Sequence, residues 1–302
     1  MEFITHKELA KFEQVPYNYT GKSNFLYSFS ILPKEERNAI NSVYAFCSYI
    51  DNIVDTIPSD DEKVIEIKKN RLNLWESVIE EIYSDKHKHK ILIPFIKAIE
   101  RFNIPKQYFL ILIDGCRRDL YQKRYKTFEE LKQYCYSVAS VVGLITIEIF
   151  GHQYEETKNY AINLGYALQL TNILRDIKTD KDRGYIYIPQ EDLKRFNYSE
   201  EDLINEVYNE KFIELMRFEV KRTREYYHKA RSLLHPDERP NLIAAEIMDE
   251  IYYRILEKIE LKNYNVFNKK IKVSNLHKLI FAIKHWLSIK MFVKRIKKSN
   301  FY

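Results

Sequence analysis

Apolar residues recur every three or four positions along most of this chain, as they do on one face of an α-helix. The pattern is interrupted at Pro58, Pro105 and Gly151, and again in the turn segment "HPDERP". Residues 183–189, "RGYIYIP", read as a loop or a short extended piece. We expect helices, the second of them capped by Ser59, over residues 34–57, 59–83, 91–102, 105–120, 127–150, 155–180, 199–235, 240–262 and 275–298.

The composition supports an all-α fold. The chain has 302 residues, of which 45% are hydrophobic, so it is long enough to bury a large core. It contains only 6 Gly and 8 Pro, which disfavours a turn-rich β fold. No long linker or repeat divides it, so we expect a single domain over residues 1–302. Cys47, Cys116 and Cys135 fall inside helical patterns and are expected to be reduced, buried thiols.

The charge and hydropathy of the chain indicate where in the cell the protein is expected. The net charge is +6, and the basic residues gather in "KHWLSIKMFVKRIKK", residues 284–298. No run approaches the ~20 apolar residues of a membrane span, and no signal peptide is apparent, so we expect a cytoplasmic protein. The segment 276–298 has two interpretations: a helix lying on the anionic inner face of a membrane, or a docked terminal helix with a solvated basic end.

One polar stripe runs along an otherwise apolar helix. In "LQLTNILRDIKTDKDRGYIYIP", residues 168–189, Gln169, Asn172, Asp176 and Asp180 follow one another at helical spacing and share a face. A helix that is apolar nearly all round is normally buried, and buried polar groups need partners. Another part of the protein or a ligand must therefore satisfy this stripe.

A second apolar helix carries a similar stripe. Asp51 and Asp55 lie four residues apart, and Tyr44 and Ser48 continue the same face. Two neighbouring carboxylates on a buried helix are costly unless a cation compensates them. A single acidic pair is more often a solvated face, but two pairs on two apolar helices favour a metal site.

The ligand types favour Mg²⁺ and a phosphorylated substrate. The stripes offer carboxylate and amide oxygens without a Cys/His cluster, which suits a hard ion that completes its shell with water and phosphate. Nearby bases for the phosphate charge are Arg175, Lys178, Lys181 and Arg183.

The chain is also rich in aromatic residues, with 24 Tyr and 17 Phe. An aromatic cavity suits a long apolar chain and stabilises carbocations. Metal-bound diphosphate above such a cavity is the layout for ionising an allylic diphosphate. Small residues in "YCYSVASVVGLITIEIFG", residues 134–151, serve either tight helix packing or room for an isoprenoid tail.

These segments together resemble the squalene/phytoene synthase family of head-to-head prenyl synthases. The resemblance rests on "YAFCSYIDNIVD", "YCYSVASVVGL", "LGYALQLTNILRDIKTDKDRGYIYIP", "SNFLYSFSILP" and "ILEKIELKNYNVF", and it covers about residues 20–285. It implies an all-α isoprenoid-synthase fold with a central cavity. It also implies that two prenyl diphosphates are joined through a cyclopropyl diphosphate.

The resemblance assigns roles by motif position. The metal ligands would be Asp51, Asp55, Asn172, Asp176 and Asp180. The four aspartates would also be catalytic, together with Tyr134, Arg175 and Tyr187. The substrate-binding residues would be Ser23, Asn24, Phe25, Tyr44, Asp119, Val138, Gly143, Gln169, Asn172, Tyr252 and, as a weaker candidate, Lys269.

Three positions depart from the family pattern. Asn52 replaces a second acid after Asp51, Ser48 stands where an Arg is common, and Tyr185 replaces the Arg of the usual "RGRIYLP". Two phosphate-binding cations are therefore missing. Three alternatives follow: catalysis is weaker, the diphosphate geometry differs, or Arg183 and Lys181 substitute for the missing cations. All four metal-binding aspartates remain, which favours an active enzyme.

The product is left open between two readings. "ALQLTNILRD" and "IEIFG" resemble most the branch that converts two farnesyl diphosphates into presqualene diphosphate, and a phytoene synthase acting on two geranylgeranyl diphosphates is the alternative. No G-x-G-x-x-G loop is present, so an NADPH-dependent step is not supported, although this family does not require that loop. A catalytically inactive helical scaffold is the alternative of another class, and a nucleic-acid partner is not expected because the apolar helices carry acids.

Overall fold

The computed structural model describes residues 28–55, 61–84 and 92–299, with side chains as far as residue 288. In these parts the chain is helical and forms no β-strand, and a single bridge pairs Arg124 with Ile186. The α-helices are α3 (Lys34–Asp55), α4 (Glu62–Tyr83), α5 (Ile93–Phe102), α6 (Lys106–Arg118), α7 (Phe128–Cys135), α8 (Val141–Phe150), α9 (Glu156–Asp182), α10 (Gln190–Arg195), α11 (Glu200–Ile204), α12 (Glu210–Leu233), α13 (Ile243–Leu261) and α14 (Asn275–Ser299). This confirms the expected all-α isoprenoid-synthase fold.

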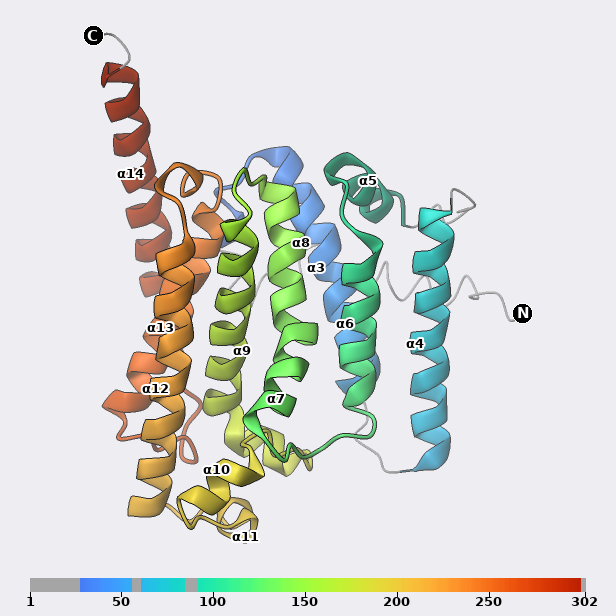
Figure 1. Ribbon diagram of the computed structural model, residues 1–302, viewed down its shortest axis with the longest axis vertical. Helices are drawn as coiled ribbons and strands as arrows, with labels where there is room; N and C mark the ends of the chain where they lie inside the picture. The colour runs from blue at the N-terminus through green and yellow to red at the C-terminus, as the bar shows by residue number, and fades with distance from the viewer. Residues whose placement is uncertain (1–27, 56–60, 85–91, 300–302) are drawn as a thin grey trace.

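The long helices stand roughly side by side around α9 (Figure 1). Helix α9 packs most extensively against α12 and also contacts α8 and α13, while α4 covers α6 at the far edge. The apolar residues of α9 are buried nearly all round the helix. The polar stripe on α9 therefore lies inside the molecule.

Two expected boundaries were wrong. Helix α4 is capped by Asp61, whose side chain accepts a hydrogen bond from the backbone N–H of Lys63 at 2.8 Å; the predicted cap, Ser59, lies outside the described residues. The helix predicted over 199–235 is two helices, because Glu206 has a φ of 55° and breaks the first. The side chain of Asn209 then caps α12.

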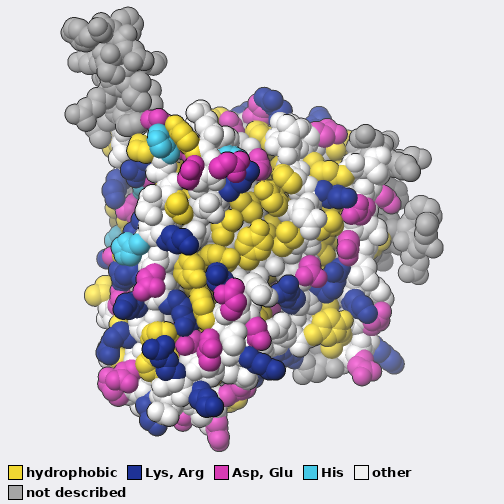
Figure 2. Space-filling model, viewed as in Figure 1, with side chains coloured by type: hydrophobic (Ala, Val, Ile, Leu, Met, Phe, Trp, Pro, Cys, Tyr) yellow, Lys and Arg dark blue, Asp and Glu magenta, His cyan; other side chains and the backbone are white. Residues whose placement is uncertain are grey.

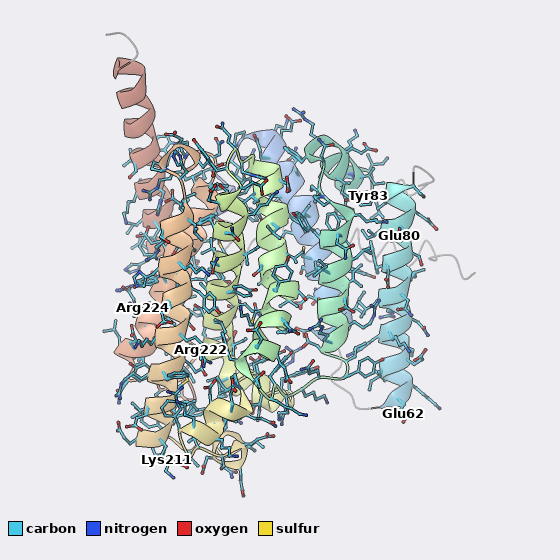
Figure 3. All side chains as sticks on the ribbon, in the orientation of Figure 1. Glu62, Glu80, Tyr83, Lys211, Arg222 and Arg224 are labelled. Carbon is cyan, nitrogen blue, oxygen red and sulfur yellow. The ribbon has the colours of Figure 1, made fainter. Side chains whose placement is uncertain are left out.

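Buried ion pairs fix the short helices below this layer. Arg222 of α12, labelled in Figure 3, donates to Asp192 of α10 at 2.7 Å and to Glu219 one turn earlier at 3.0 Å. Both acids are almost fully buried. They would be costly without this guanidinium, so the three groups hold α10 in place below α12.

The helices α7 and α8 form one rod that contains a wide turn, the π-helix η3 (Tyr136–Ser140). Small residues let two neighbours approach it closely. A Cβ added at Gly115 would come within 2.6 Å of the Ser137 Cβ, and one at Gly165 would come within 2.4 Å of the Ser140 Cα. Contrary to the expectation from the sequence, one segment, the rod Phe128–Phe150, is long and apolar enough to cross a membrane by length and composition alone. However, 56% of its most apolar window is buried in the protein. The small residues therefore serve tight packing here.

Candidate active site

A cavity of about 300 Å³ lies between α3, α6, the rod α7–η3–α8, α9 and α13. Its walls are mostly apolar, but polar side chains gather at one end of it. The polar residues at that end are Ser48, Asp51, Gln169 and Asn172, and the hydroxyl-bearing rings of Tyr44, Tyr134 and Tyr252 also line the cavity. The predicted stripes on α3 and α9 thus face the same space.

The amide of Asn172 indicates a missing partner. Its Oδ1 is buried and makes no hydrogen bond within the described parts of the chain. A buried carbonyl oxygen without a partner is costly, so natural structures rarely keep one. An amide oxygen held this way beside carboxylates is ready to accept a cation or a donor from a ligand.

The acids of α9 have basic partners. Asp176 is bound by the guanidinium of Arg175, with an Nε–Oδ1 distance of 3.1 Å, and by Lys270 Nζ at 2.9 Å. Burial would raise the pKa of Asp176, but Arg175 and Lys270 outweigh it and hold that pKa below its usual value. One turn on, burial and the charge of Asp176 raise the pKa of Asp180 to about 7.

The acids of α3 are arranged differently. Arg183, at the end of α9, bonds Asp55 through its carboxylate at 2.9 Å and its backbone carbonyl at 3.0 Å. Asp51 lines the cavity and its side chain is exposed to solvent there. The protein atoms that surround it, followed by the charge of Asp55, raise the pKa of Asp51 to about 7. Asp51 therefore carries a charge that its protein surroundings do not fully compensate.

A cluster of tyrosines surrounds Asp119 beside these acids. Tyr134 donates to one carboxylate oxygen at 2.9 Å, and Tyr187 donates to the other at 3.4 Å. Tyr185 donates to the Asp119 backbone carbonyl at 2.9 Å and stacks on Tyr187. Burial raises the pKa of Asp119 to about 7, with a smaller contribution from Asp51. The cluster therefore holds a carboxyl group that exchanges a proton near neutral pH.

The rest of the cavity is apolar. Val138 and Gly143, both predicted to contact substrate, lie in its wall on η3 and α8. Apolar side chains also gather on the protein surface over α8 (Figure 2). Gly143 also serves close packing, because a Cβ there would come within 2.8 Å of the Ala161 backbone oxygen. Tight packing is therefore what the small residues of this segment do, and room for an isoprenoid tail stays a prediction.

The structure places the remaining predicted residues as follows. Lys269 is exposed and has no contact near the acids, whereas its neighbour Lys270 reaches Asp176. Ser23, Asn24 and Phe25 lie outside the described residues. Within the described parts, the other predicted substrate-binding and catalytic residues except Asp180 line the cavity or belong to the clusters around Asp55, Asp119 and Asp176. Asp180 lines a separate small space with Tyr185 and Tyr187, and the charges of Asp176 and Asp55 act on it there.

The three departures from the family pattern have structural explanations. Ser48 accepts a hydrogen bond from Asn52 at 3.4 Å, and Tyr185 joins the tyrosine cluster. Of the two proposed substitutes for the missing cations, Arg183 lies beside Asp55, but Lys181 is bound to Asp182 and Glu206. Arg175, Arg183 and Lys270 therefore bind the acids directly, and Lys68, which donates to the Val54 carbonyl, lies close enough to interact with the charge of Asp55.

Sequence reasoning missed several lining residues. They are apolar or weakly polar groups whose helical spacing matches that of ordinary core positions, so no local signal marks them. Cys47 and Cys116 are among them; both are free thiols, and burial raises the pKa of Cys47 to about 12. The others are Phe29, Leu112, Ala139, Val142, Thr146, Ile147, Phe150, Tyr160, Ala161, Leu164, Gly165, Leu168, Ala244, Ala245 and Met248.

The described residues include no group of three or more Asp, Glu, His or Cys side chains close enough to hold a metal by themselves. The acids instead form two pairs on two helices, and Asp55 contributes to the raised pKa of Asp180 across the gap. Such pairs fit an ion that takes most of its other ligands from water and phosphate.

Comparison with known proteins decides the family. The sequence profile "Squalene/phytoene synthase" matches residues 20–277, which is most of the chain. The chain belongs to the squalene/phytoene synthase family. It is therefore a prenyltransferase of the type that joins two prenyl diphosphates head to head, as its two acid pairs and apolar cavity indicated.

Individual members of the squalene/phytoene synthase family are similar over most of their length. A 15-cis-phytoene synthase of Synechocystis sp. is 37% identical over 272 residues, covering 85% of this chain and 78% of the relative. A squalene synthase of Alicyclobacillus acidocaldarius superposes with a TM-score of 0.74 at 26% identity, covering 86% of this chain and 97% of the other. A ligand-bound dehydrosqualene synthase gives 0.76 at 25% identity, covering 94% and 97%.

Proposed function

We propose that this protein condenses two molecules of geranylgeranyl diphosphate into phytoene. The observation that carries the proposal is the cavity itself: Asp51 and the Asn172 oxygen, which has no partner among the described residues, line it together with mostly apolar side chains. The other acids, Asp55, Asp176 and Asp180, follow further along the same two helices. Phytoene synthases that are 36% and 37% identical to this chain favour this substrate over the farnesyl diphosphate that motif resemblance favoured.

We propose Asp51, Asp55, Asn172, Asp176 and Asp180 as the residues that hold Mg²⁺. Their oxygens suit this ion, and the raised pKa values of Asp51 and Asp180 show negative charge that the protein leaves partly uncompensated. When bound, Mg²⁺ would neutralise the diphosphate charge that develops as the allylic C–O bond breaks.

The chain's own residues would do the remaining work. Arg175, Arg183 and Lys270 would bind diphosphate oxygens not taken by the metal. The apolar walls would exclude water from the allylic cation. Tyr134 and Tyr187, held by Asp119 beside the acids, would place ring faces and hydroxyls next to that cation.

Electron balance supports phytoene as the end of the reaction. After the two chains are joined and both diphosphates have left, a C40 cation remains. Loss of a proton gives phytoene without any reductant, whereas squalene formation would require a hydride donor. The chain shows no nucleotide loop of the G-x-G-x-x-G type, so our proposal includes no NADPH step.

Helix α14 suggests how the protein meets its lipid-like substrate. Beyond its contact with α13, this helix exposes Leu276, Leu279, Ile280, Ile283, Trp286 and Leu287, which share one side at helical spacing. The basic residues that follow would attract an anionic surface. We propose a cytoplasmic protein that contacts the inner membrane face through residues 276–298.

The deciding experiment is an assay with Mg²⁺, no NADPH, and labelled C15 and C20 diphosphates offered separately. Phytoene from the C20 substrate, abolished by a chelator, is the expected result. Presqualene diphosphate from the C15 substrate alone would instead support the farnesyl reading. No product from either substrate, with no Mg²⁺-dependent substrate binding, would favour the inactive scaffold.

Membrane contact is tested separately by flotation with vesicles containing anionic lipid. The chain should float, and the double variant Ile283→Ser/Leu287→Ser should not. Equal flotation of both proteins, or equal flotation after removal of residues 284–302, would contradict the assignment.

A further inference from the structure

A second cavity lies behind the apolar one. It measures about 440 Å³, is bordered by α12, α13 and α14 next to the first turns of α9, and is partly open to solvent, since the side chains of Arg239 and Lys284 that line it are exposed. Ion pairs line it: Arg231 with Asp249 at 2.6 Å, Arg239 with Glu246, and Glu250 with both Lys284 at 2.7 Å and His285 at 2.6 Å. The two neighbouring spaces therefore differ sharply in polarity.

Tyr160 of α9 is the one described residue that lines both cavities. It is only 1% exposed, and its hydroxyl is buried without a hydrogen-bond partner among the described residues. After burial, the charges of Asp249 and Glu246 contribute most to its raised pKa, which shows that the hydroxyl lies toward the charged side. The aromatic ring then forms the boundary of the apolar side.

The position of Tyr160 along α9 makes it an end wall. About 18 Å of helix separates it from Asn172 at the polar end, at 1.5 Å per residue. Its neighbours in the lining, Ala161 on α9 and Ala244 and Ala245 on α13, are small. Larger side chains, among them Phe150, Leu164 and Met248, also line the cavity, but of the described residues only Tyr160 also borders the charged space.

We propose that Tyr160 sets the longest prenyl chain that the cavity accepts. A chain that ended short of the ring would be surrounded by apolar groups. A longer chain would have to displace the ring and enter a space lined by ion pairs. There the apolar chain would disrupt the ion pairs without offering the charged groups any polar contact in return. The limit on length is therefore both steric and electrostatic.

This inference rests on the proposed function, because it names the residue that selects the substrate of the same cavity. It is tested with C15, C20 and C25 prenyl diphosphates as competing substrates. The variant Tyr160→Ala should raise the ratio of kcat/KM for C25 over C20 by about tenfold or more. Tyr160→Phe keeps the wall and should leave this ratio within about twofold of its original value.

Two further variants keep the test decisive. Ala245→Phe adds bulk beside the wall and should lower the C20-to-C15 ratio. Tyr198→Ala removes an equally buried ring that lines neither cavity, and so reports the effect of lost stability alone. If Tyr160→Ala fails to fold, Ala245→Phe carries the test, and an unchanged ratio there overturns the proposal.

Binding separates this proposal from the proposed function. The affinities of unreactive C15, C20 and C25 thiolodiphosphates, measured by calorimetry on the full chain with Mg²⁺, should shift toward longer chains in Tyr160→Ala even without turnover. If no turnover is observed but the affinities of Tyr160→Ala shift toward longer chains, the condensation reaction is refuted and the role of Tyr160 as the end wall of the cavity is supported. If Tyr160→Ala folds and keeps the original preference for chain length, the proposal that Tyr160 limits chain length is overturned, whatever reaction the wild type catalyses.

Discussion

Helices α3 and α9 carry the same pair of carboxylates one turn apart, but their surroundings differ. On α9, Asp176 is bound by Arg175 and Lys270, which hold its pKa below the usual value. On α3, burial and Asp55 raise the pKa of Asp51 to about 7. The difference lies in the bases supplied to each helix and not in the acids themselves.

This comparison separates two roles within one site. The first acid of α9 is neutralised by the protein and is therefore held in place before any ligand arrives. The first acid of α3 retains an uncompensated charge, so it gains most when a cation binds. We infer that Asp176 of α9 is fixed before any ligand arrives and that Asp51 of α3 responds to the metal. The second acid of each helix reverses these roles, because Asp55 is bound by Arg183 and Asp180 has a pKa of about 7.

The largest expected effect is the loss of activity in Asp51→Asn. Turnover should fall by a factor on the order of 10²–10³, because a charged oxygen ligand at the ionising diphosphate is lost. The melting temperature should stay the same or rise, since the repulsion of Asp55 is removed. Steady-state assays and thermal unfolding check both outcomes, with Asp114→Asn on the exposed side of α6 as the matched control. A large drop in the melting temperature of Asp51→Asn would contradict the proposed difference between Asp51 on α3 and Asp176 on α9.

Asp176→Asn tests the fixed acid. We expect lost activity and also a lower free energy of unfolding, by about 2 kcal/mol, because the buried Arg175 loses its partner. The decrease is smaller than the usual cost of breaking a buried ion pair because Lys270, the other partner of Asp176, is half exposed. Denaturant unfolding of Asp176→Asn beside Asp51→Asn measures the contrast. Equal stability of the two variants would contradict it.

The pH dependence of Mg²⁺ binding gives the third test. Asp51 and Asp180 have folded-state pKa values of about 7, above their ordinary value of 3.8, so the folded chain without metal holds extra protons. Its stability should therefore fall as pH rises from about 4 through 7. Mg²⁺ must displace those protons, so its apparent affinity should weaken about fivefold from pH 7 to pH 6 if it displaces one proton from a group whose pKa is about 7. Calorimetry in buffers of different ionisation enthalpy counts that proton, and an affinity independent of pH would contradict the assignment.

The sequence predicted those features that depend on local helical geometry. The acid stripes were recognisable because residues three and four apart share a face, so Asp51 with Asp55 and Asp176 with Asp180 required no tertiary information. The α11–α12 break was missed because Glu206 adopts a left-handed φ that its residue type does not signal.

Features that depend on packing between distant segments could not be predicted. Tyr160 marks the border of two cavities only after α12, α13 and α14 assemble beside α9. Tyr185 looked like a lost cation, and only its hydrogen bond to Asp119 shows that it belongs to the tyrosine cluster. Periodicity alone cannot distinguish such residues from ordinary core positions.

The smallest expected effect concerns the adjacent lysines near α14. Lys270 reaches Asp176 at 2.9 Å, while Lys269 is exposed and has no contact there, so only the first supplies charge to the α9 acids. Lys270→Gln should raise KM about threefold to tenfold, a modest change because the side chain is half exposed and screened by solvent. Lys269→Gln has the same change in net charge and should leave KM within about twofold. Measuring KM at low and at high salt distinguishes a local contact from long-range attraction. Salt screens long-range attraction of the substrate equally in both variants, whereas loss of a local contact raises KM in one variant only. If the two substitutions raised KM equally, the basic partners of Asp176 would act as a diffuse field, and the contrast between α9 and α3 would have to rest on Arg175 alone.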